Sequence, residues 1–570
     1  MMRIFNGIKT AGIWITLVII GIIAFINVFF TLCYVSPYSI RNQYFDFEAA
    51  LIGIIIAIAI LYCLYKLKDK ILSCKLKTLI IISMMITLII GISWVIMSQY
   101  TSASDSYRIL INALSIPNDW RKVNYLQKFP YQSGVLLYML LYAYPLHNIS
   151  TQTIYLIMEY VNIIPVCLTT LMLILLTREL FNEKTAKITA VLTSLFITIP
   201  LTVVQVYGNI LSLPLTIACI LLIVKTANII KNNHKIKRKT MKTIIINMSV
   251  LIMLSFIIGA LKLNNVIIGI AMTLGIMIFT VELIAEHHKT KTIIGRTGKI
   301  AISVFFIAGI LIIPMMMTGE HASIKTVEIL RDYPFDENKQ QPATVFIGMG
   351  MGDESDHGPG FYFYELGNET VNVQKAEKKS RIIIHNRLNQ LKEDPTSFIM
   401  FFANKIAYTW SEPTYSYATR PAKTLYDIRN NEQNDNSKGQ LDDTNWKPVV
   451  LNETFGQKIV DSEQLMIILR TFTDGICIII AIFALIGAYM NRKNIIINMI
   501  PAIAIAGGFL FHIFWETQPE YAYTYFLLLI PYAAYGMNNN AIILEKLKRI
   551  RQTGGIHKKD STENETLKNS

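Results

Sequence analysis

Charged residues are scarce in this 570-residue chain, at 16% of the sequence, whereas a soluble domain carries about a quarter. Disulfide and zinc motifs are also missing, because the six cysteines include no Cys-x-x-Cys pair and lie within or beside long apolar runs. The strict apolar–polar alternation of a transmembrane barrel is absent. These absences exclude a soluble enzyme, a disulfide scaffold, a zinc module and an outer-membrane barrel.

Apolar residues make up 53% of the chain and gather into blocks of about twenty, such as Ile13–Leu32, Leu79–Met97 and Ile300–Met317. A helix of that length crosses the hydrocarbon core of a bilayer and satisfies every backbone group internally. The pattern predicts an all-α polytopic membrane protein with about 12 transmembrane helices. The expected spans are 11–35, 48–65, 78–98, 154–176, 185–204, 208–226, 243–261, 264–284, 299–317, 467–490, 494–513 and 523–543.

Lysine and arginine gather in short links between these spans, as the positive-inside rule predicts for cytoplasmic loops. The main basic links are Lys66–Lys77, Arg178–Lys187, Lys231–Lys242, Lys289–Lys299 and Lys546–Arg551. We therefore expect a multi-pass protein of the cell membrane with both termini in the cytoplasm and the first apolar run retained as a signal-anchor. The net charge of +14 comes from these links, so we expect no nucleic-acid partner.

The order of spans and links predicts five regions. They are an N-terminal transmembrane hairpin (1–77), a transmembrane core (78–317) with an outer loop (99–153), a mixed extracellular loop domain (318–466), C-terminal transmembrane helices (467–545) and a disordered cytoplasmic tail (546–570). The apolar stretch Gly134–Leu146 is too short to span, so we expect it to lie in the membrane plane. Phe398–Trp410 is expected to be a second in-plane helix.

The loop Ser98–Gln132 holds Asp105, Arg108 and Arg121, and Asp105 follows the third span closely enough to lie near the outer headgroups. A carboxylate at that depth suits a base that accepts a proton from a hydroxyl. Aspartate is also a favoured helix N-cap, so Asp105 has a purely structural alternative.

Further polar residues lie in other outer links. Lys262, at the outer mouth of the seventh span, suits a lipid phosphate but is equally a lysine that marks a helix end. Tyr207 is a possible sugar contact in the tight link before Gly208. Glu516, Gln518 and Tyr521 form a polar link behind Trp515, where carboxylates suit a sugar or a metal. Arg470 and Asp474, four residues apart on one helix, are expected to neutralise each other.

Several segments resemble the bacterial GT-C glycosyltransferases, akin to protein O-mannosyltransferases and the aminoarabinose transferase of lipid A. The resemblance is to the Gram-positive branch and extends in order from about residue 100 to 540. The segments are Ser104-Asp-Ser-Tyr-Arg108, Phe129-Pro-Tyr-Gln-Ser-Gly134, Thr177-Arg-Glu-Leu-Phe-Asn182, Val206-Tyr-Gly-Asn-Ile-Leu-Ser212, Leu261-Lys-Leu-Asn-Asn265, Phe346-Ile-Gly-Met-Gly350, Gly358-Pro-Gly-Phe-Tyr362, Lys405–Pro413 and Phe514-Trp-Glu-Thr-Gln518.

The resemblance implies a GT-C-like fold with its active site on the extracellular face, and transfer of a sugar from a polyprenyl-phosphate donor in the membrane lipid. The acceptor would be a cell-wall glycopolymer, a lipid or a protein. Asp105 would be the catalytic base. The substrate-binding residues would be Arg108, Arg121, Gln132, Tyr207, Lys262, Glu516, Gln518 and Tyr521.

Two other functions stay open from the sequence, namely a flippase or transporter for lipid-linked oligosaccharide and a polysaccharide polymerase. No residues are assigned to a metal and no cofactor is certain. A divalent cation stays open as well, since Asp105 has no neighbouring Asp-x-Asp partner.

Overall fold

The structure, a computed structural model, describes residues 2–29, 47–99, 105–115, 124–232, 236–290, 295–354, 358–362, 366–367, 372–421, 454–460 and 462–539. Nearly all of its secondary structure is helical. The long helices are α1 (Met2–Phe29), α2 (Phe47–Ser73), α3 (Leu76–Ser98), α7 (Thr151–Leu180), α10 (Gly208–Asn232), α11 (Arg238–Leu261), α12 (Val266–Thr290), α13 (Arg296–Arg331), α19 (Glu463–Asn491) and α20 (Ile500–Phe514).

Shorter elements connect the long helices. These are α4 (Asp105–Ser115), α5 (Asn124–Lys128), η2 (Pro130–Gln132), α6 (Ser133–Ala143), α8 (Glu183–Leu195), α9 (Thr198–Leu201), η3 (Thr202–Val204), η4 (Leu263–Asn265), η5 (Glu337–Lys339), α14 (Ala343–Met351), α15 (Val373–Glu393), α16 (Pro395–Ser411), α18 (Phe455–Val460), η6 (Ile496–Met499) and α21 (Pro519–Leu527). The described sheet is one antiparallel pair, β1 (Asp353–Glu354) and β2 (Gly358–Pro359).

Within the described residues, ten helices are long and apolar enough to cross a membrane, and an eleventh span results if Glu183–Leu195 and Thr198–Val204 are taken together. The expectation of an all-helical, multi-pass membrane protein is confirmed. Prolines inside α7, α10 and α13 fit this setting, because neighbouring helices in a membrane bundle can satisfy the freed backbone groups.

Three predicted spans differ in detail. The span expected at 185–204 is broken by a bend of 52° between α8 and α9. Helix α13 does not end at Met317 but continues to Arg331. The span expected at 523–543 begins as α21 and continues, after a turn at 528–529, as helical residues 530–539. Its last residues, together with the expected tail, lie outside the described part of the chain.

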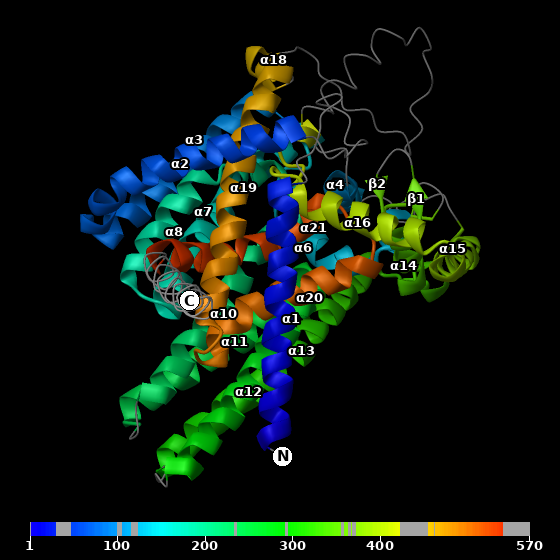
Figure 1. Cartoon of the computed structure of the whole chain (residues 1–570). Helices are drawn as coiled ribbons and strands as arrows, with labels where there is room; N and C mark the ends of the chain where they lie inside the picture. The colour runs from blue at the N-terminus through cyan, green and yellow to red at the C-terminus, as the bar shows by residue number, and fades with distance from the viewer. Residues whose placement is uncertain are drawn as a thin grey trace, which may run out of the picture.

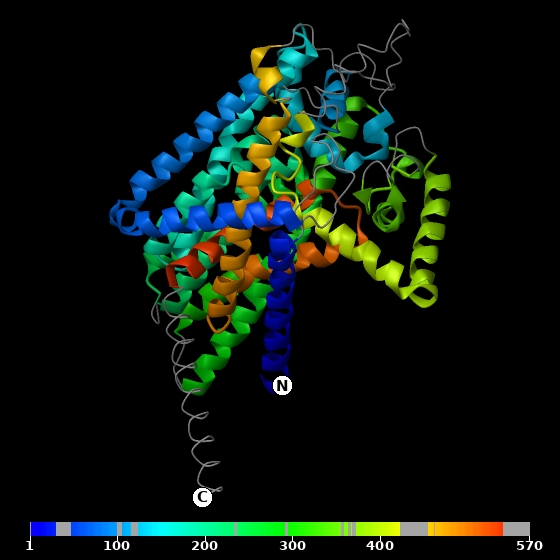
Figure 2. The same ribbon diagram turned by 45° about the horizontal axis from the view of Figure 1, so that its top comes forward.

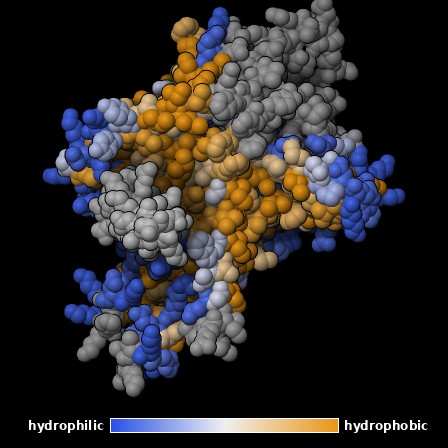
Figure 3. Space-filling model, in the orientation of Figure 1, coloured by the Kyte–Doolittle hydropathy of each residue, from blue (hydrophilic) through white to orange (hydrophobic). Residues whose placement is uncertain are grey.

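The surface has the polarity of a membrane protein. Figure 3 shows hydrophobic residues in a band between hydrophilic residues at the left and lower edges and a second hydrophilic group on the right. Trp14, Ile15 and Val18 of α1 are each at least half exposed, as lipid-facing side chains would be. The α2–α3 link and the joined ends of α10–α11 and α12–α13 lie toward the left and lower edges, opposite α14 and α15 (Figures 1 and 2). The helix ends that border three of the five basic links therefore lie away from α14 and α15.

The two stretches expected to lie in the membrane plane are both helical. The first is α6, whose eleven residues are too few to span a bilayer. The second is α16, which starts at Pro395 after the side chain of Asp394 caps the amide of Ser397. Helix α16 meets the end of α1, where the side chain of Asn27 donates a hydrogen bond to the carbonyl oxygen of Trp410 (3.1 Å).

Candidate functional site

Asp105 is the first residue of α4, seven positions after the end of α3 at Ser98. Its carboxylate therefore lies where the first amides of a helix have no helical partner and the helix dipole favours negative charge. The next residue, Ser106, is buried, and its hydroxyl lies 2.9 Å from the hydroxyl of Tyr155 in α7. This contact fixes the start of α4 against the bundle and leaves Asp105 half-buried.

Lys262 lies between α11 and η4, in extended backbone, and its amide donates to the carbonyl of Ile258 (2.8 Å). Its ammonium nitrogen lies 4.7 Å from the centre of the Tyr207 ring, a cation–π contact. Gly134 and Gly208 pack directly on the carbonyl oxygens of Ala260 and Leu261, where a Cβ atom would overlap them. These two glycines let α6 and α10 approach the strand-like link that carries Lys262.

Tyr207 itself is buried and accepts a hydrogen bond from the side-chain amide of Gln132 in η2. The predicted residues Gln132, Tyr207 and Lys262 therefore form one connected group. Tyr131, beside Gln132, is half-buried, and its phenol has a pKa raised by burial and then by the negative charges of Glu516 and Asp105. The η2 segment consequently faces both of these carboxyl groups.

The link Trp515–Gln518 approaches the same place from α20. Trp515 stacks on Phe346 of α14, with ring centres 5.1 Å apart and planes at 12°. The amide of Glu516 donates to the carbonyl of Phe346 (3.0 Å), and that of Thr517 donates to the carbonyl of Gly360 (3.1 Å). The link thus adds backbone hydrogen bonds to α14 and to the turn after β2, which aims the half-buried side chain of Glu516.

Lys405 of α16 supports this link from behind. Its side chain is fully buried, and its ammonium donates to the carbonyl oxygens of Gly350 (2.6 Å), Ile513 (2.9 Å) and Trp515 (2.8 Å). Burial lowers the pKa of Lys405 to about 7. All three ammonium protons are used, so Lys405 holds α14 and the end of α20 together and does not face a ligand.

The electrostatics link these segments into one site. Burial, and then the negative charge of Asp105, raise the pKa of Glu516 to about 8, although the positive charge of Lys262 opposes the shift. Burial lowers the pKa of Lys262, whereas Asp105, Glu516 and Glu520 each raise it. Asp105, Lys262 and Glu516 therefore lie close enough for their charges to interact.

Glu520, in the first turn of α21, forms an ion pair with Arg420, which follows the turn at the end of α16. The hydroxyl of Tyr408 donates to the side-chain oxygen of Gln518 (2.9 Å), so this amide packs against α16. Tyr521 stacks on His512 with ring centres 5.8 Å apart. Burial, and then Glu516 and Glu520, raise the pKa of the Tyr521 phenol.

The structure therefore brings together Asp105, Gln132, Tyr207, Lys262, Glu516 and Tyr521. Arg108 lies one turn along α4 from Asp105. Burial and the negative charge of Asp105 raise the pKa of the Tyr125 phenol, whereas the positive charge of Arg108 lowers it. Gln518 is 7% exposed and contacts Tyr408. Arg121 lies outside the described residues. In the described part of the chain, no group of three or more His, Cys, Asp or Glu side chains is arranged to hold a metal ion.

Sequence reasoning missed several residues of this region. Lys405 contacts Trp515 and Arg420 contacts Glu520, each about a hundred positions away, so the local sequence gave no sign of these partners. Tyr125 and Tyr131 carry no sequence signal that separates them from the aromatic residues that anchor membrane interfaces. Lys405 is the only charged residue in the segment Phe398–Trp410, and this was the one available signal.

No protein-family model and no curated protein matches this chain. Among solved structures, the chain is similar to the archaeal oligosaccharyltransferase AglB from Archaeoglobus fulgidus, solved in complex with an inhibitory peptide and a dolichol-phosphate. The TM-score is 0.40 at 13% sequence identity, and the match covers 84% of this chain and 51% of that chain. The chain thus spans about half the length of that protein. A likeness at this level assigns neither a family nor an activity.

Proposed function

We propose that the protein is a membrane glycosyltransferase that moves a sugar from a polyprenyl-phosphate donor to a hydroxyl group of an extracellular acceptor. One observation carries this proposal, namely the grouping of Asp105, Lys262 and Glu516 at one end of the helix bundle. The three residues come from separate segments and act on one another electrostatically. The ordered resemblance to GT-C glycosyltransferases along the sequence points the same way.

The proposed reaction uses Asp105 as the base. Its carboxylate accepts the proton of the acceptor hydroxyl while the hydroxyl oxygen bonds to the anomeric carbon of the donor sugar. The bond between that carbon and the phosphate oxygen breaks, and its electron pair stays on the phosphate. The departing polyprenyl phosphate gains negative charge, which the Lys262 ammonium stabilises. Arg108 and Arg121 are proposed as further phosphate contacts.

Glu516 has a different role from Asp105. Because its pKa is about 8, its side chain is mostly a neutral carboxylic acid at neutral pH and can donate a hydrogen bond. A neutral donor beside Lys262 suits a phosphate or a sugar hydroxyl, since it adds no repulsion toward an anion. Gln132, Tyr207, Gln518 and Tyr521 are proposed to contact the sugar.

The placement of these groups favours an enzyme over a transporter. Asp105, Lys262 and Glu516 all lie at helix starts or in links between helices. Transporters for charged substrates instead place their binding groups near the bilayer midplane. The proposal puts the site on the extracellular side, opposite the basic links, with a cell-wall glycopolymer, a lipid or a protein as acceptor.

The test uses membranes that contain the protein and a radiolabelled polyprenyl-phosphate sugar. A transferase moves the label covalently onto an acceptor and releases unlabelled polyprenyl phosphate in equal amount. A flippase moves the labelled lipid between leaflets with no covalent transfer. Movement of the lipid without release of polyprenyl phosphate would overturn the proposal, and membranes lacking the protein provide the control.

A further inference from the structure

We propose that Glu520 is an internal counter-ion, which holds Arg420 until the phosphate group of a lipid ligand takes its place. This inference rests on the proposed function, because it concerns the phosphate end of the same site. It assigns Arg420 as a ligand-binding residue and Glu520 as a competitor of the ligand.

The ion pair joins two distant parts of the chain. Glu520 is in the first turn of α21, next to the Tyr521 side chain of the site, and Arg420 follows α16. The Glu520 side chain is 8% exposed, whereas that of Arg420 is 27% exposed. A ligand anion can therefore approach the guanidinium from the solvent side while the carboxylate stays behind it.

Two cations, Arg420 and Lys262, influence the pKa of the Glu520 carboxyl group. Burial raises the pKa of Glu520, Arg420 opposes this rise most strongly, Asp105 adds to it and Lys262 also opposes it. The charge of Glu520 in turn raises the pKa of Lys262. The carboxylate is thus attracted both to the cation proposed to bind phosphate and to a second cation nearby.

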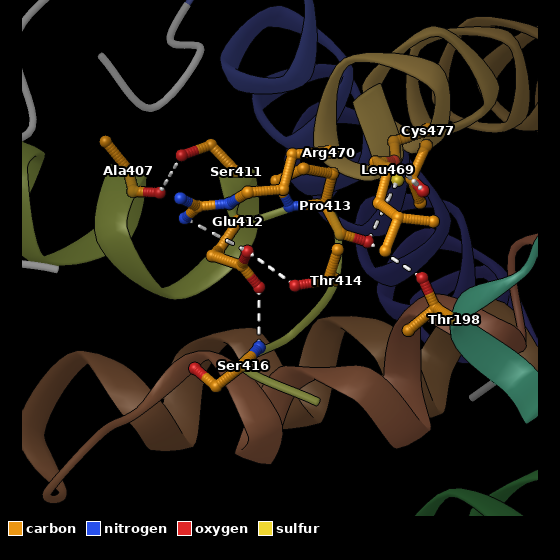
Figure 4. Close-up of polar contacts among 11 residues, drawn as sticks. Thr198, Ala407, Ser411, Glu412, Pro413, Thr414, Ser416, Leu469, Arg470 and Cys477 are labelled. Atoms are coloured by element: carbon orange, nitrogen blue, oxygen red, sulfur yellow. Dashed lines mark hydrogen bonds and ion pairs between the residues drawn. The ribbon is translucent and has the colours of Figure 1, made fainter. Parts of the chain in front are cut away.

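A buried turn fixes the segment that carries Arg420. The carboxylate of Glu412 accepts hydrogen bonds from the hydroxyl of Thr414 (2.8 Å) and the amide of Ser416 (2.6 Å), and lies 3.4 Å from the guanidinium of Arg470 (Figure 4). The carbonyl of Ser416 then accepts a hydrogen bond from the amide of Arg420 (3.0 Å). The backbone of Arg420 is thereby held in place, so its side chain can exchange partners without refolding the segment.

A phosphate monoester is a stronger partner than a carboxylate for a guanidinium. It carries about −1.5 to −2 charges at neutral pH and offers three acceptor oxygens, which suit the planar donor fork of arginine. In the ligand-free protein, the pair with Glu520 spares Arg420 the cost of an uncompensated charge. Binding must displace this carboxylate, so Glu520 should weaken the affinity for phosphate.

The experiment measures equilibrium binding and thermal unfolding of the purified full chain with farnesyl phosphate, and with farnesol as the phosphate-free control. We expect Glu520→Gln to bind farnesyl phosphate about fivefold or more tightly than the wild type, as an intramolecular coupling of ordinary size would give. Farnesyl phosphate should also raise the unfolding temperature of Glu520→Gln more than that of the wild type. Arg420→Gln should weaken binding, and Glu337→Gln, an exposed carboxylate in η5, should match the wild type.

The outcomes separate the two proposals. If the wild type binds farnesyl phosphate no better than farnesol, the proposed function fails. If the wild type prefers farnesyl phosphate and Glu520→Gln binds it equally or more weakly, the counter-ion role of Glu520 fails while the proposed function stands. Should Glu520→Gln not fold, Glu520→Met provides the same comparison, because it also removes the carboxylate and should therefore release Arg420 and tighten binding.

Discussion

The ammonium nitrogen of Lys262 lies 4.7 Å from the centre of the Tyr207 ring, and Tyr207 is hydrogen-bonded to Gln132. The aromatic face stabilises the cation in a half-buried place where its pKa is already lowered by burial. The contact aims the charge of Lys262 toward Asp105 and Glu516 and gives the cation a fixed position before any ligand binds.

Replacing Lys262 should therefore affect chemistry more than folding. We expect Lys262→Gln to reduce kcat by about 10²–10³, as loss of one charge-stabilising donor usually does. Lys262→Arg should keep more activity, because a guanidinium also stacks on an aromatic ring and carries the same charge. Steady-state transfer rates measured against donor concentration check this. A Lys262→Gln variant with unchanged kcat would show that the ammonium does not act on the leaving group.

The raised pKa of Glu516 predicts that transfer activity is lost at alkaline pH. Its pKa of about 8 means that the neutral acid loses its proton as pH rises through that value, placing a negative charge where phosphate must bind. The rate of sugar transfer should fall above about pH 8. The side chain that Glu516→Gln introduces is neutral at every pH, so this variant should not show the fall. A pH–rate profile of both proteins is the measurement. If Glu516→Gln shows the same fall in activity above about pH 8, the alkaline limit does not come from Glu516.

The raised pKa of Glu516 also makes the free energy of unfolding depend on pH. The folded pKa of Glu516 lies above its ordinary value of 4.5, so the folded state binds more protons than the unfolded state between these two pH values. The contribution of Glu516 to the free energy of unfolding is complete below pH 4.5 and is lost as pH rises through about 8. Thermal unfolding of wild type and Glu516→Gln across this range should show the wild type losing relative stability with rising pH.

Lys405 should matter for folding of the site. Lys405→Met keeps most of the length of the side chain but leaves one buried and two partly buried carbonyl oxygens without their donor, at a cost of about 2–4 kcal/mol. Gly360→Ala should also destabilise the protein, since Gly360 has φ +86° and packs on the Lys405 side chain. Thermal unfolding in detergent measures both. Lys392→Met, at an exposed lysine, is the matched control. If Lys405→Met unfolds at the same temperature as the wild type, Lys405 does not hold α14 and the end of α20 together.

The ion pair of Glu412 with Arg470 gives a prediction about buried charge. Both side chains are at most 3% exposed, so Glu412→Ala removes the carboxylate that faces the buried guanidinium and should cost about 3–5 kcal/mol. The double replacement Glu412→Leu with Arg470→Met should cost less than Glu412→Ala, because neither member of the ion pair is left as a buried charge without the other. A double-mutant cycle by thermal unfolding tests this. Additive losses would mean that the two side chains do not stabilise each other.

Long apolar runs made the helices predictable, since any such run must become a helix in lipid. The start of α4 at Asp105 and the link at Lys262 were also visible, because a span has to end near its last apolar residue. The sequence did not show which side chains on different helices contact each other. The sequence pointed to Asp474 as the partner of Arg470, four residues away, but the ion pair in the structure is with Glu412. The Oδ2 atom of Asp474 has no hydrogen-bond partner among the described residues.

The same limit applies to the site. Arg420 pairs with Glu520, and Lys405 binds the carbonyl of Trp515, from positions that no local pattern connects. The extension of α13 to Arg331 was missed because its last turns are polar and hydropathy alone placed the end of the helix at the membrane boundary. Such contacts follow from how the helices pack, which one sequence does not specify by itself.

The most direct test of the account is Asp105→Asn, which keeps the shape of the side chain and removes the base. In membranes with equal amounts of folded protein, transfer of labelled sugar from polyprenyl phosphate to acceptor should fall by about 10²–10⁴. Glu337→Gln, an exposed carboxylate in η5, should transfer at the wild-type rate. Transfer at the wild-type rate by Asp105→Asn would contradict the account.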